Sequence, residues 1–168
     1  MKIQKLDIVV PIIGGLTCFL LLLNIPVWAL FFGWAWYFNL GAAPNVFKKA
    51  IPPMFFGYVV AGISIIVFNA LSGNIYVLAA IVCLTIFLLM LSMKASVFAA
   101  SLASFNAYSC LFAGYFAGNY PALANGGPWD LYNVVISILW IALANVLGLI
   151  CGYLSIRLGV QKNQAKEI

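Results

Sequence analysis

The chain has 168 residues, of which 66% are hydrophobic and only 7% are charged, and its mean hydropathy is +1.14. These values exclude a water-soluble globular protein, which needs far more polar surface at this size, and they identify the bilayer as the solvent. The net charge of +5 comes from a few residues between apolar runs, which indicates membrane topology and no nucleic-acid partner.

Six apolar runs predict an all-α polytopic membrane protein that forms one transmembrane domain over residues 1–168. Helices of about 20 residues joined by short loops use the whole chain, so no separate soluble module is expected. Every run except the second is long enough to cross the bilayer with some tilt. The predicted spans are residues 8–23, 26–40, 51–71, 74–93, 95–118 and 131–158.

The first two runs are separated by Asn24, Ile25 and Pro26, which predict a reversal because proline suits the first turn of a helix. The alternative is one long kinked span. Short cytoplasmic loops retain Lys and Arg. Six spans place all basic residues on one side of the membrane, whereas a fused first span would separate Lys2 and Lys5 from the others. Both termini are therefore predicted to be cytoplasmic. These residues are Lys2, Lys5, Lys48, Lys49, Lys94, Arg157, Lys162 and Lys166.

The same topology places Asp130 and the turn-rich stretch 119–128 outside the cell. Aromatic side chains close to the ends of the runs are expected to anchor the protein at the membrane surface. They are Trp28, Tyr76, Tyr120, Trp129 and Tyr132.

The interior of the runs contains no Asp, Glu, Lys, Arg or His, the residue types that form proton relays and charged-substrate sites. General acid–base catalysis and metal binding at membrane depth also need these residues. A serine without a neighbouring base is not an activated nucleophile. The sequence therefore predicts no enzyme, no cofactor and no metal site.

The polar residues that remain include asparagines in or at the ends of the runs. In a structural interpretation they hydrogen-bond between helices or to backbone, a contribution of about 0.6 to 2 kcal/mol each. In a functional interpretation, Asn106 and Asn145 offer a donor and an acceptor to a small neutral solute that crosses the bundle. The four asparagines are Asn39, Asn69, Asn106 and Asn145.

The fifth run separates into two stripes at helical spacing. One consists of small residues around one amide: Ala99, Ala103, Asn106, Cys110, Ala113 and Ala117. The other is aromatic: Phe98, Phe105, Phe112 and Phe116. In a structural interpretation, the small stripe packs against another helix and the aromatic stripe contacts lipid or the core. In a functional interpretation, an amide beside aromatic rings binds a planar uncharged molecule. The predicted solute path comprises Trp34, Asn69, Phe105, Asn106, Tyr108, Phe112 and Asn145.

A short similarity links the ends of the second and fifth runs. Residues 37–41 read YFNLG and are followed by Pro44, while residues 115–119 read YFAGN and are followed by Pro121. These segments belong to the middle helices of two three-span halves. Three spans per half would give the halves opposite orientation, an inverted repeat with a site at its interface. Chance similarity in aromatic-rich sequence is the alternative.

The chain resembles the YcdZ-like bacterial inner-membrane proteins, a domain of unknown function. The resemblance covers most of the chain and rests on Tyr37-Phe38, on the segment 48–51 leading to Gly57, and on Ser104-Phe105 followed by Cys110, Phe112, Ala113 and Gly114. It implies a small multi-span protein of the bacterial cytoplasmic membrane and no known site residues. Residues 104–107 with Gly114 also look like segments that line bacterial urea transporters.

We therefore expect a channel or facilitator for a small neutral or weakly polar solute, such as urea or a short amide. Its small helix faces predict a homo-oligomer in the lipid bilayer. One alternative is a structural or regulatory membrane subunit without transport activity. Another is an ion-coupled transporter that uses backbone carbonyls at broken helices, for which Gly14-Gly15 and Pro52-Pro53 are candidate positions.

Overall fold

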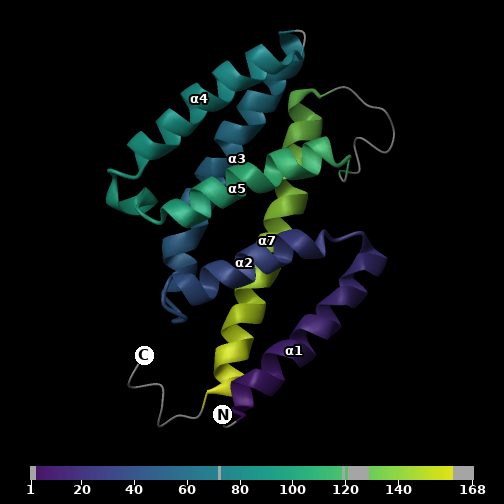
Figure 1. Cartoon of the computed structure of the whole chain (residues 1–168), viewed down its shortest axis with the longest axis vertical. Helices are drawn as coiled ribbons and strands as arrows, with labels where there is room; N and C mark the ends of the chain where they lie inside the picture. The colour runs from purple at the N-terminus through teal and green to yellow at the C-terminus, as the bar shows by residue number, and fades with distance from the viewer. Residues whose placement is uncertain (1–2, 72, 119, 121–128, 161–168) are drawn as a thin grey trace. The chain divides into compact units, whose positions relative to one another are not determined.

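The computed structural model describes residues 3–71, 73–118, 120 and 129–160, and in these residues all regular structure is helical (Figure 1). In this described part, two short 3₁₀ helices, η1 (Cys18–Leu23) and η2 (Ser96–Phe98), accompany six α-helices. The α-helices are α1 (Lys5–Thr17), α2 (Val27–Asn39), α3 (Val46–Ala70), α4 (Ile75–Ser92), α5 (Ser101–Phe116) and α7 (Leu131–Gly159). The predicted all-helical fold is therefore confirmed.

Among the described residues, four helical segments are long and apolar enough to cross a membrane: Lys5–Leu23, which joins α1 to η1, and the whole of α3, α4 and α7. The other two helices are shorter, with 13 residues in α2 and 16 in α5. At 1.5 Å per residue they rise about 20 Å and about 24 Å, less than the hydrocarbon thickness of about 30 Å. The described part of the chain thus has four candidate spans by length.

The described chain divides into two compact units. The first consists of Met1–Phe47 with Leu143–Ile168, and the second of Lys48–Ala142. The first therefore contains α1, η1, α2 and the later part of α7, while the second contains nearly all of α3, then α4, η2, α5 and the start of α7.

In the first unit, the chain reverses between η1 and α2, as the sequence predicts. Asn24 has a φ of 57°, in the left-handed region that asparagine tolerates, and its backbone N–H donates to Leu21 at 2.9 Å. The N–H of Ile25 donates to Leu20 at 3.1 Å, and Pro26 precedes the first residue of α2. The chain therefore does not continue as one helix through residues 24–26, and whether α1 and α2 cross the membrane separately stays a prediction.

Close backbone packing joins α2 to α7 in this unit. A methyl group at Gly33 would overlap the backbone carbonyl of Asn145, so only glycine allows the two helices to approach this closely. The fully buried side chains of Leu30 and Trp36 flank this contact on α2. At the end of α7, Gly159 lies against Leu6, so the basic residues of both helix ends share one end of the unit.

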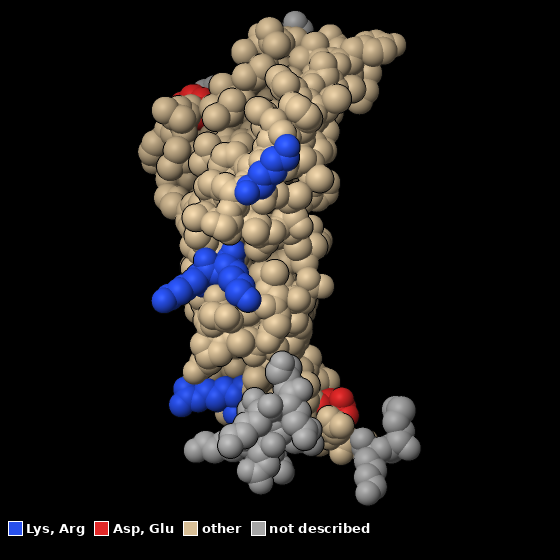
Figure 2. All heavy atoms as spheres, turned by 90° about the vertical axis from the view of Figure 1, so that its left-hand side faces the viewer, with Lys and Arg blue, Asp and Glu red and all other residues tan. Residues whose placement is uncertain are grey.

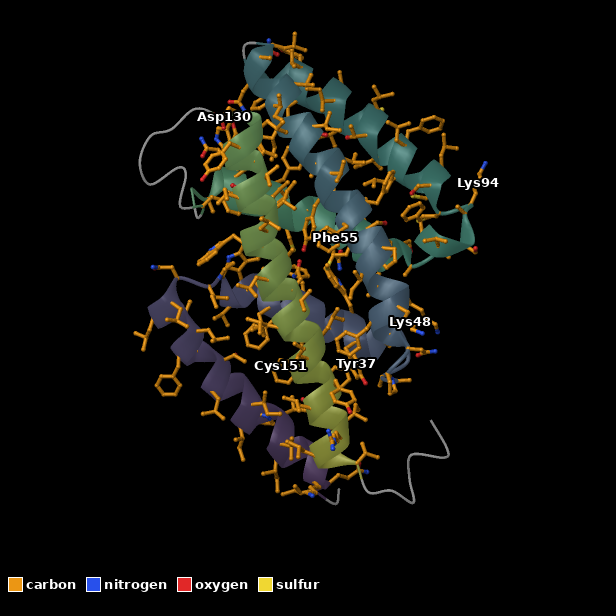
Figure 3. The ribbon with its side chains drawn as sticks, turned by 180° about the vertical axis from the view of Figure 1, so that it is seen from behind. Tyr37, Lys48, Phe55, Lys94, Asp130 and Cys151 are labelled. Atoms are coloured by element: carbon orange, nitrogen blue, oxygen red, sulfur yellow. The ribbon has the colours of Figure 1, made fainter. Side chains whose placement is uncertain are left out.

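In the second unit, a short turn joins α3 to α4. Gly73 has a φ of 65° in the connection, and the side chain of Asn74 caps α4 by accepting from the N–H of Val77 at 3.0 Å. Lys48 in the first turn of α3 and Lys94 just after α4 therefore lie on one side of the unit, opposite Asp130 (Figure 3). This separation agrees with the predicted sidedness of basic residues.

The fifth helix begins later than the sequence predicts. In place of one helix over 95–118, the chain makes the short helix η2, breaks at Ala99 and Ala100, and starts α5 at Ser101. A methyl group at Gly57 would overlap the backbone carbonyl of Ser104, so α5 packs closely on α3. From there α5 runs away from the lysine end of the unit towards the end of α3.

The outer faces of the helices are apolar. Only 6% of the Lys5–Leu23 segment and 11% of α4 are buried, and the face drawn in Figure 2 has few charged side chains. Tyr76 and Tyr132 are 84% and 71% exposed, as expected of anchors at the membrane surface. The prediction is wrong for Tyr120, which is buried by contacts within the second unit.

Candidate functional site

The predicted stripes of the fifth run do not coincide with the faces of α5. Ala103 and Cys110 from the small stripe are buried, whereas Ala113 is exposed. In the aromatic stripe, Phe112 is buried while Phe105 and Phe116 are exposed. The helix begins at Ser101, so Phe98 and Ala99 are not part of it. The buried face is instead made of Ala103, Ser104, Ala107, Tyr108, Cys110, Leu111, Phe112 and Gly114.

Asn106 lies at the edge of this buried face and is half-buried. Its side chain makes no hydrogen bond with any residue that the structure describes. The neighbouring Phe105 is exposed and lines a cavity of about 280 Å³ together with Met90, Met93 and four other residues of α4, α5 and their connection. Asn106 thus offers both a donor and an acceptor.

Tyr108 joins α5 to α4 through a hydroxyl pair. Its hydroxyl lies 2.9 Å from the hydroxyl of Thr85, which itself is 2.7 Å from the backbone carbonyl of Ile81. Because Thr85 has one proton and donates it to Ile81, Tyr108 is the donor to Thr85. The rings of Tyr108 and Phe112 are 4.9 Å apart, so these two predicted path residues pack against each other.

At the end of α3, both polar atoms of the Asn69 side chain are hydrogen-bonded. Its amide nitrogen donates to the carbonyl of Ile65 at 2.7 Å, and its oxygen accepts from the hydroxyl of Tyr115 at 3.1 Å. The ring of Tyr115 is in turn 4.7 Å from that of Trp129. Asn69 therefore joins α3 to α5, as the structural interpretation expects.

Asn145 is fully buried in the first unit. Its amide nitrogen donates to the backbone carbonyl of Ala29, which links α7 to α2. This residue also follows the structural interpretation. Among the predicted amides, Asn69 and Asn145 are thus used in helix packing.

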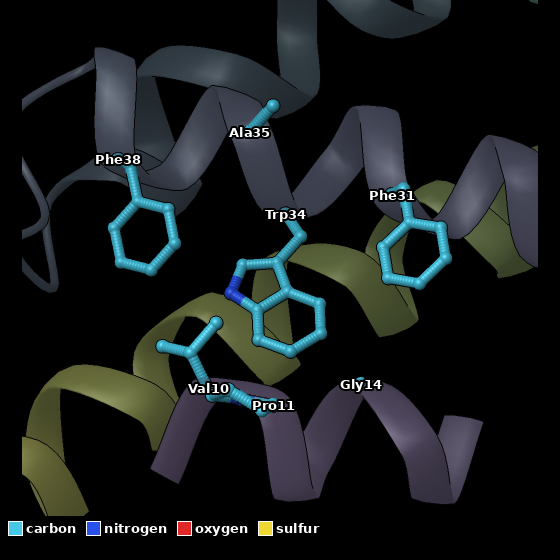
Figure 4. A pocket seen from close by; sticks show the side chains of 7 residues that line it. All are labelled: Val10, Pro11, Gly14, Phe31, Trp34, Ala35 and Phe38. Atoms are coloured by element: carbon cyan, nitrogen blue, oxygen red, sulfur yellow. The ribbon is translucent and has the colours of Figure 1, made fainter. Parts of the chain in front are cut away.

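Trp34 belongs to a different feature of the first unit, a cavity of about 370 Å³ between α1 and α2. Figure 4 shows its indole between the two helices, with the nitrogen on the side of Val10 and Phe38. Trp34 is only 4% exposed, and its N–H has no acceptor in the described chain. The cavity is lined by Val10, Pro11, Gly14, Phe31, Trp34, Ala35 and Phe38.

Tyr120 closes the end of the second unit and was not predicted to do so. Its ring lies over Gly114. Its hydroxyl donates to the backbone carbonyl of Leu111 at 3.0 Å, and the backbone carbonyl of Cys110 is a second acceptor at 3.3 Å. Burial, with a smaller effect of Cys110, raises the pKa of this phenol. Tyr120 therefore stays a neutral donor and ties the chain after α5 back to that helix.

A protein-family model matches most of this chain. The model of a family described as "Protein of unknown function (DUF1097)" matches residues 7–160. The chain belongs to the DUF1097 family. No curated protein and no solved structure matches it. The expected membership of an uncharacterised family is thus confirmed, while the YcdZ-like assignment and the likeness of residues 104–107 to urea transporters stay predictions.

Sequence reasoning missed two residues that organise this DUF1097 chain. Thr85 was not singled out although it is paired with Tyr108, and Tyr115 was noted only for the internal similarity. A hydroxyl group in an apolar helix is the available signal, since it needs a partner away from water. Within the described residues no group of three or more His, Cys, Asp or Glu side chains could hold a metal ion.

Proposed function

We propose that this protein is a membrane facilitator that lets a small neutral or weakly polar solute, of the urea or amide type, cross the bilayer down its gradient. The proposal rests on Asn106, whose half-buried amide makes no hydrogen bond with the described residues. The amides of Asn69 and Asn145 already hold helices together. A free amide can exchange hydrogen bonds with a passing solute that carries the same groups.

The absence of charge along the helices supports passive movement. In the described helices, Asp, Lys and Arg occur only in first or last turns, as with Lys5, Asp7, Lys48, Lys49 and Arg157. Proton-driven transporters use ionisable side chains at membrane depth. A neutral interior favours a neutral solute and a mechanism without proton coupling.

Six crossings with both termini in the cytoplasm accompany this proposal. In the second unit, α5 leads from the end that carries Lys48 and Lys94 to the end of α3, where Tyr115 meets Asn69. It has the direction of a crossing helix although it is short. The preceding helix η2 extends it towards the lysine end. In the bacterial cytoplasmic membrane, the basic ends would face the cytoplasm.

An inverted repeat of two three-helix halves is supported by the internal packing of the units. In one unit, Gly33 of the second helix packs on the backbone of the last helix, α7. In the other, the fifth helix, α5, packs through Ser104 on Gly57 of the third helix, α3. The first half comprises α1, α2 and α3, and the second comprises α4, α5 and α7. In both cases the middle helix of one half packs on the last helix of the other half. Two similar halves that exchange their last helices would pack in this way.

One alternative also has a specific observation in its favour. The outer faces of α4 and of the Lys5–Leu23 segment are almost entirely exposed and apolar. Lipid covers such faces in a facilitator, and a second protein or a further copy of the chain covers them in a structural or regulatory subunit. The ion-coupled alternative needs broken helices whose backbone carbonyls bind the ion. Gly14-Gly15 and Pro52-Pro53 lie inside continuous helices, so these positions do not support it.

The test is solute flux into liposomes that contain only the purified full chain. We expect urea or acetamide to enter faster than into empty liposomes, as measured by light scattering after an osmotic step. Asn106→Leu should reduce the protein-dependent rate at least tenfold, and Phe105→Ala should reduce it less, because its ring lines a cavity that Asn106 does not line.

The matched control is Asn39→Leu, which removes an exposed amide at the end of α2 and should keep the full rate. Permeability equal to that of empty liposomes for every small neutral solute would reject the facilitator and favour the subunit. Equal rates for Asn106→Leu and the unmodified protein would reject the role of Asn106.

A further inference from the structure

The second unit carries positive charge at one end and has no negative charge there to pair with it. Lys48, Lys49 and Lys94 are all exposed. Figure 3 shows Lys48 and Lys94 on one side of this unit and Asp130 on the opposite side. Asp130 is the only acidic residue in the sequence of residues 48–142. An anion that pairs with these lysines therefore comes from outside the unit.

An apolar groove begins next to one of these lysines. It is the cavity of about 280 Å³ between the end of α4 and the start of α5. Met93, the residue before Lys94 in the chain, is one of its lining residues. The flexible four-carbon side chain of Lys94 lets its ammonium group reach this end of the groove. The lining residues are Leu89, Met90, Met93, Ser101, Leu102, Ser104 and Phe105.

The connection that carries Lys94 is held in place. The backbone N–H of Lys94 donates to the carbonyl of Leu91 at 3.2 Å, so this residue continues the last turn of α4. Further along the connection, the ring of Phe98 in η2 lies 5.0 Å from the ring of Phe56 in α3. The positive charge and the groove are thus fixed parts of the same unit.

The depth of the groove selects the class of molecule that occupies it. Its deepest lining residues are Leu89, five residues before Lys94, and Phe105, four residues after the first residue of α5. At 1.5 Å per residue the groove extends about 8 Å from the lysine end, out of a hydrocarbon thickness of about 30 Å. Phospholipid headgroups and the first carbons of their acyl chains lie at this level. A free anion lacks the apolar chain, and a dissolved hydrocarbon lacks the charge.

We propose that the groove between α4 and α5 binds an anionic phospholipid from the leaflet on the lysine side of the protein. One acyl chain lies in the groove, and the anionic headgroup pairs with Lys94. Basic pockets between transmembrane helices bind anionic lipid headgroups in this way. The lipid enters from the bilayer, since only 11% of α4 is buried. The proposal does not depend on the solute path assigned to Asn106.

Two lysines and two serines provide matched variants. Lys94→Gln removes the charge beside the groove, and Lys5→Gln removes the charge of an exposed lysine in the first unit. Ser101 and Ser109 are both exposed on α5, but of these only Ser101 lines the groove. Ser101→Phe therefore fills the groove, and Ser109→Phe makes the same change outside it.

The experiment measures thermal unfolding of the purified full chain in detergent with increasing lipid, because a ligand of the native state raises the Tm. The probes are dioleoylphosphatidylglycerol, which is anionic, and dioleoylphosphatidylcholine, which has the same chains and no net charge. Glycerol 3-phosphate is the anion without chains. We expect phosphatidylglycerol to raise the Tm of the unmodified protein at about one fifth of the concentration that phosphatidylcholine needs, as for one charge pair at a membrane surface.

The variants should separate the charge from the groove. Lys94→Gln should need about five times more phosphatidylglycerol for the same rise in Tm, while Lys5→Gln responds like the unmodified protein. Ser101→Phe should lose the response to phosphatidylglycerol, and Ser109→Phe should keep it.

Equal potency of phosphatidylglycerol and phosphatidylcholine on the unmodified protein would overturn the proposal, and so would equal losses in Lys94→Gln and Lys5→Gln, which would indicate a general effect of net charge. A full response of Ser101→Phe would exclude the groove. A rise in Tm with glycerol 3-phosphate alone would replace the lipid site by a site for free anions. If Ser101→Phe does not fold, the two lysine variants and the three probes still decide.

Discussion

Gly33 of α2 lies directly against the backbone carbonyl of Asn145 in α7, and Asn145 in turn donates its side-chain hydrogen bond to Ala29 of α2. The close approach and the hydrogen bond occur on one stretch of the two helices. In lipid, where helices gain little from hydrophobic burial against each other, such contacts hold a helix pair together.

A methyl group at Gly33 should therefore disrupt the first unit. We expect Gly33→Ala to lower the free energy of unfolding by about 1 to 3 kcal/mol, the cost of overpacking a close contact. Denaturant unfolding in detergent, followed by circular dichroism, measures this change. The control is Gly15→Ala, which meets no neighbouring atom and should leave stability equal or slightly higher. Equal stability of Gly33→Ala and the unmodified protein would contradict the packing.

The two asparagines with different surroundings should respond differently to the same change. Asn145→Leu removes the donor to the carbonyl of Ala29, and we expect it to lower the free energy of unfolding by about 1 to 2 kcal/mol. Asn106→Leu removes no hydrogen bond between described residues and should change stability by less than about 0.5 kcal/mol. The same unfolding measurement checks both, and a larger loss for Asn106→Leu would show that its amide has a structural role.

The hydroxyl pair of Thr85 and Tyr108 should couple α4 to α5. We expect a double-mutant cycle with Thr85→Val and Tyr108→Phe to give an interaction energy of about 0.6 kcal/mol, as is typical for hydrogen bonds between membrane helices. Ser109→Ala on the exposed side of α5 is a control, because Ser109 bonds only to the carbonyl of Phe105 in its own helix. If the effects of Thr85→Val and Tyr108→Phe on the free energy of unfolding are additive, this hydrogen bond does not stabilise the protein.

Stability should depend on Tyr120 at high pH. The pKa of this phenol is raised in the folded protein, so the unfolded chain loses the proton first, at about pH 10. Stability is therefore fully present below that pH and falls as the pH rises above it. We expect the Tm to decrease between about pH 10 and pH 11, and to decrease less in Tyr120→Phe. Tyr76→Phe, which changes an exposed phenol, should follow the unmodified protein; an unchanged slope in Tyr120→Phe would contradict the assignment.

Reporter fusions test the six crossings. A reporter after Lys94 should be active in the cytoplasm, and one near Gly126, which lies outside the described residues, should be active on the outer side. A reporter after Asn24 should also be external if α1 and α2 cross separately. A cytoplasmic signal at Gly126 would contradict this topology.

The helical content, the reversal at Asn24 to Pro26 and the position of the lysines of the second unit on one side of it could all be predicted from the sequence. These properties depend on residues close together in the chain: an apolar run long enough to need a helix in lipid, a proline that ends one helix and starts the next, and lysines beside helix ends. The start of α5 could not, because the apolar run continues through Ala99 and Ala100 while the backbone breaks there.

The tertiary structure alone decided which polar groups are free. Asn145 and Ala29 are 116 residues apart in the sequence, and Asn69 and Tyr115 are 46 apart, so no local pattern could pair them. Asn106, Asn69 and Asn145 look alike as amides in apolar runs. Packing satisfies Asn69 and Asn145, while Asn106 and the indole of Trp34 have no hydrogen-bond partner among the described residues, because each hydrogen bond depends on which helices meet.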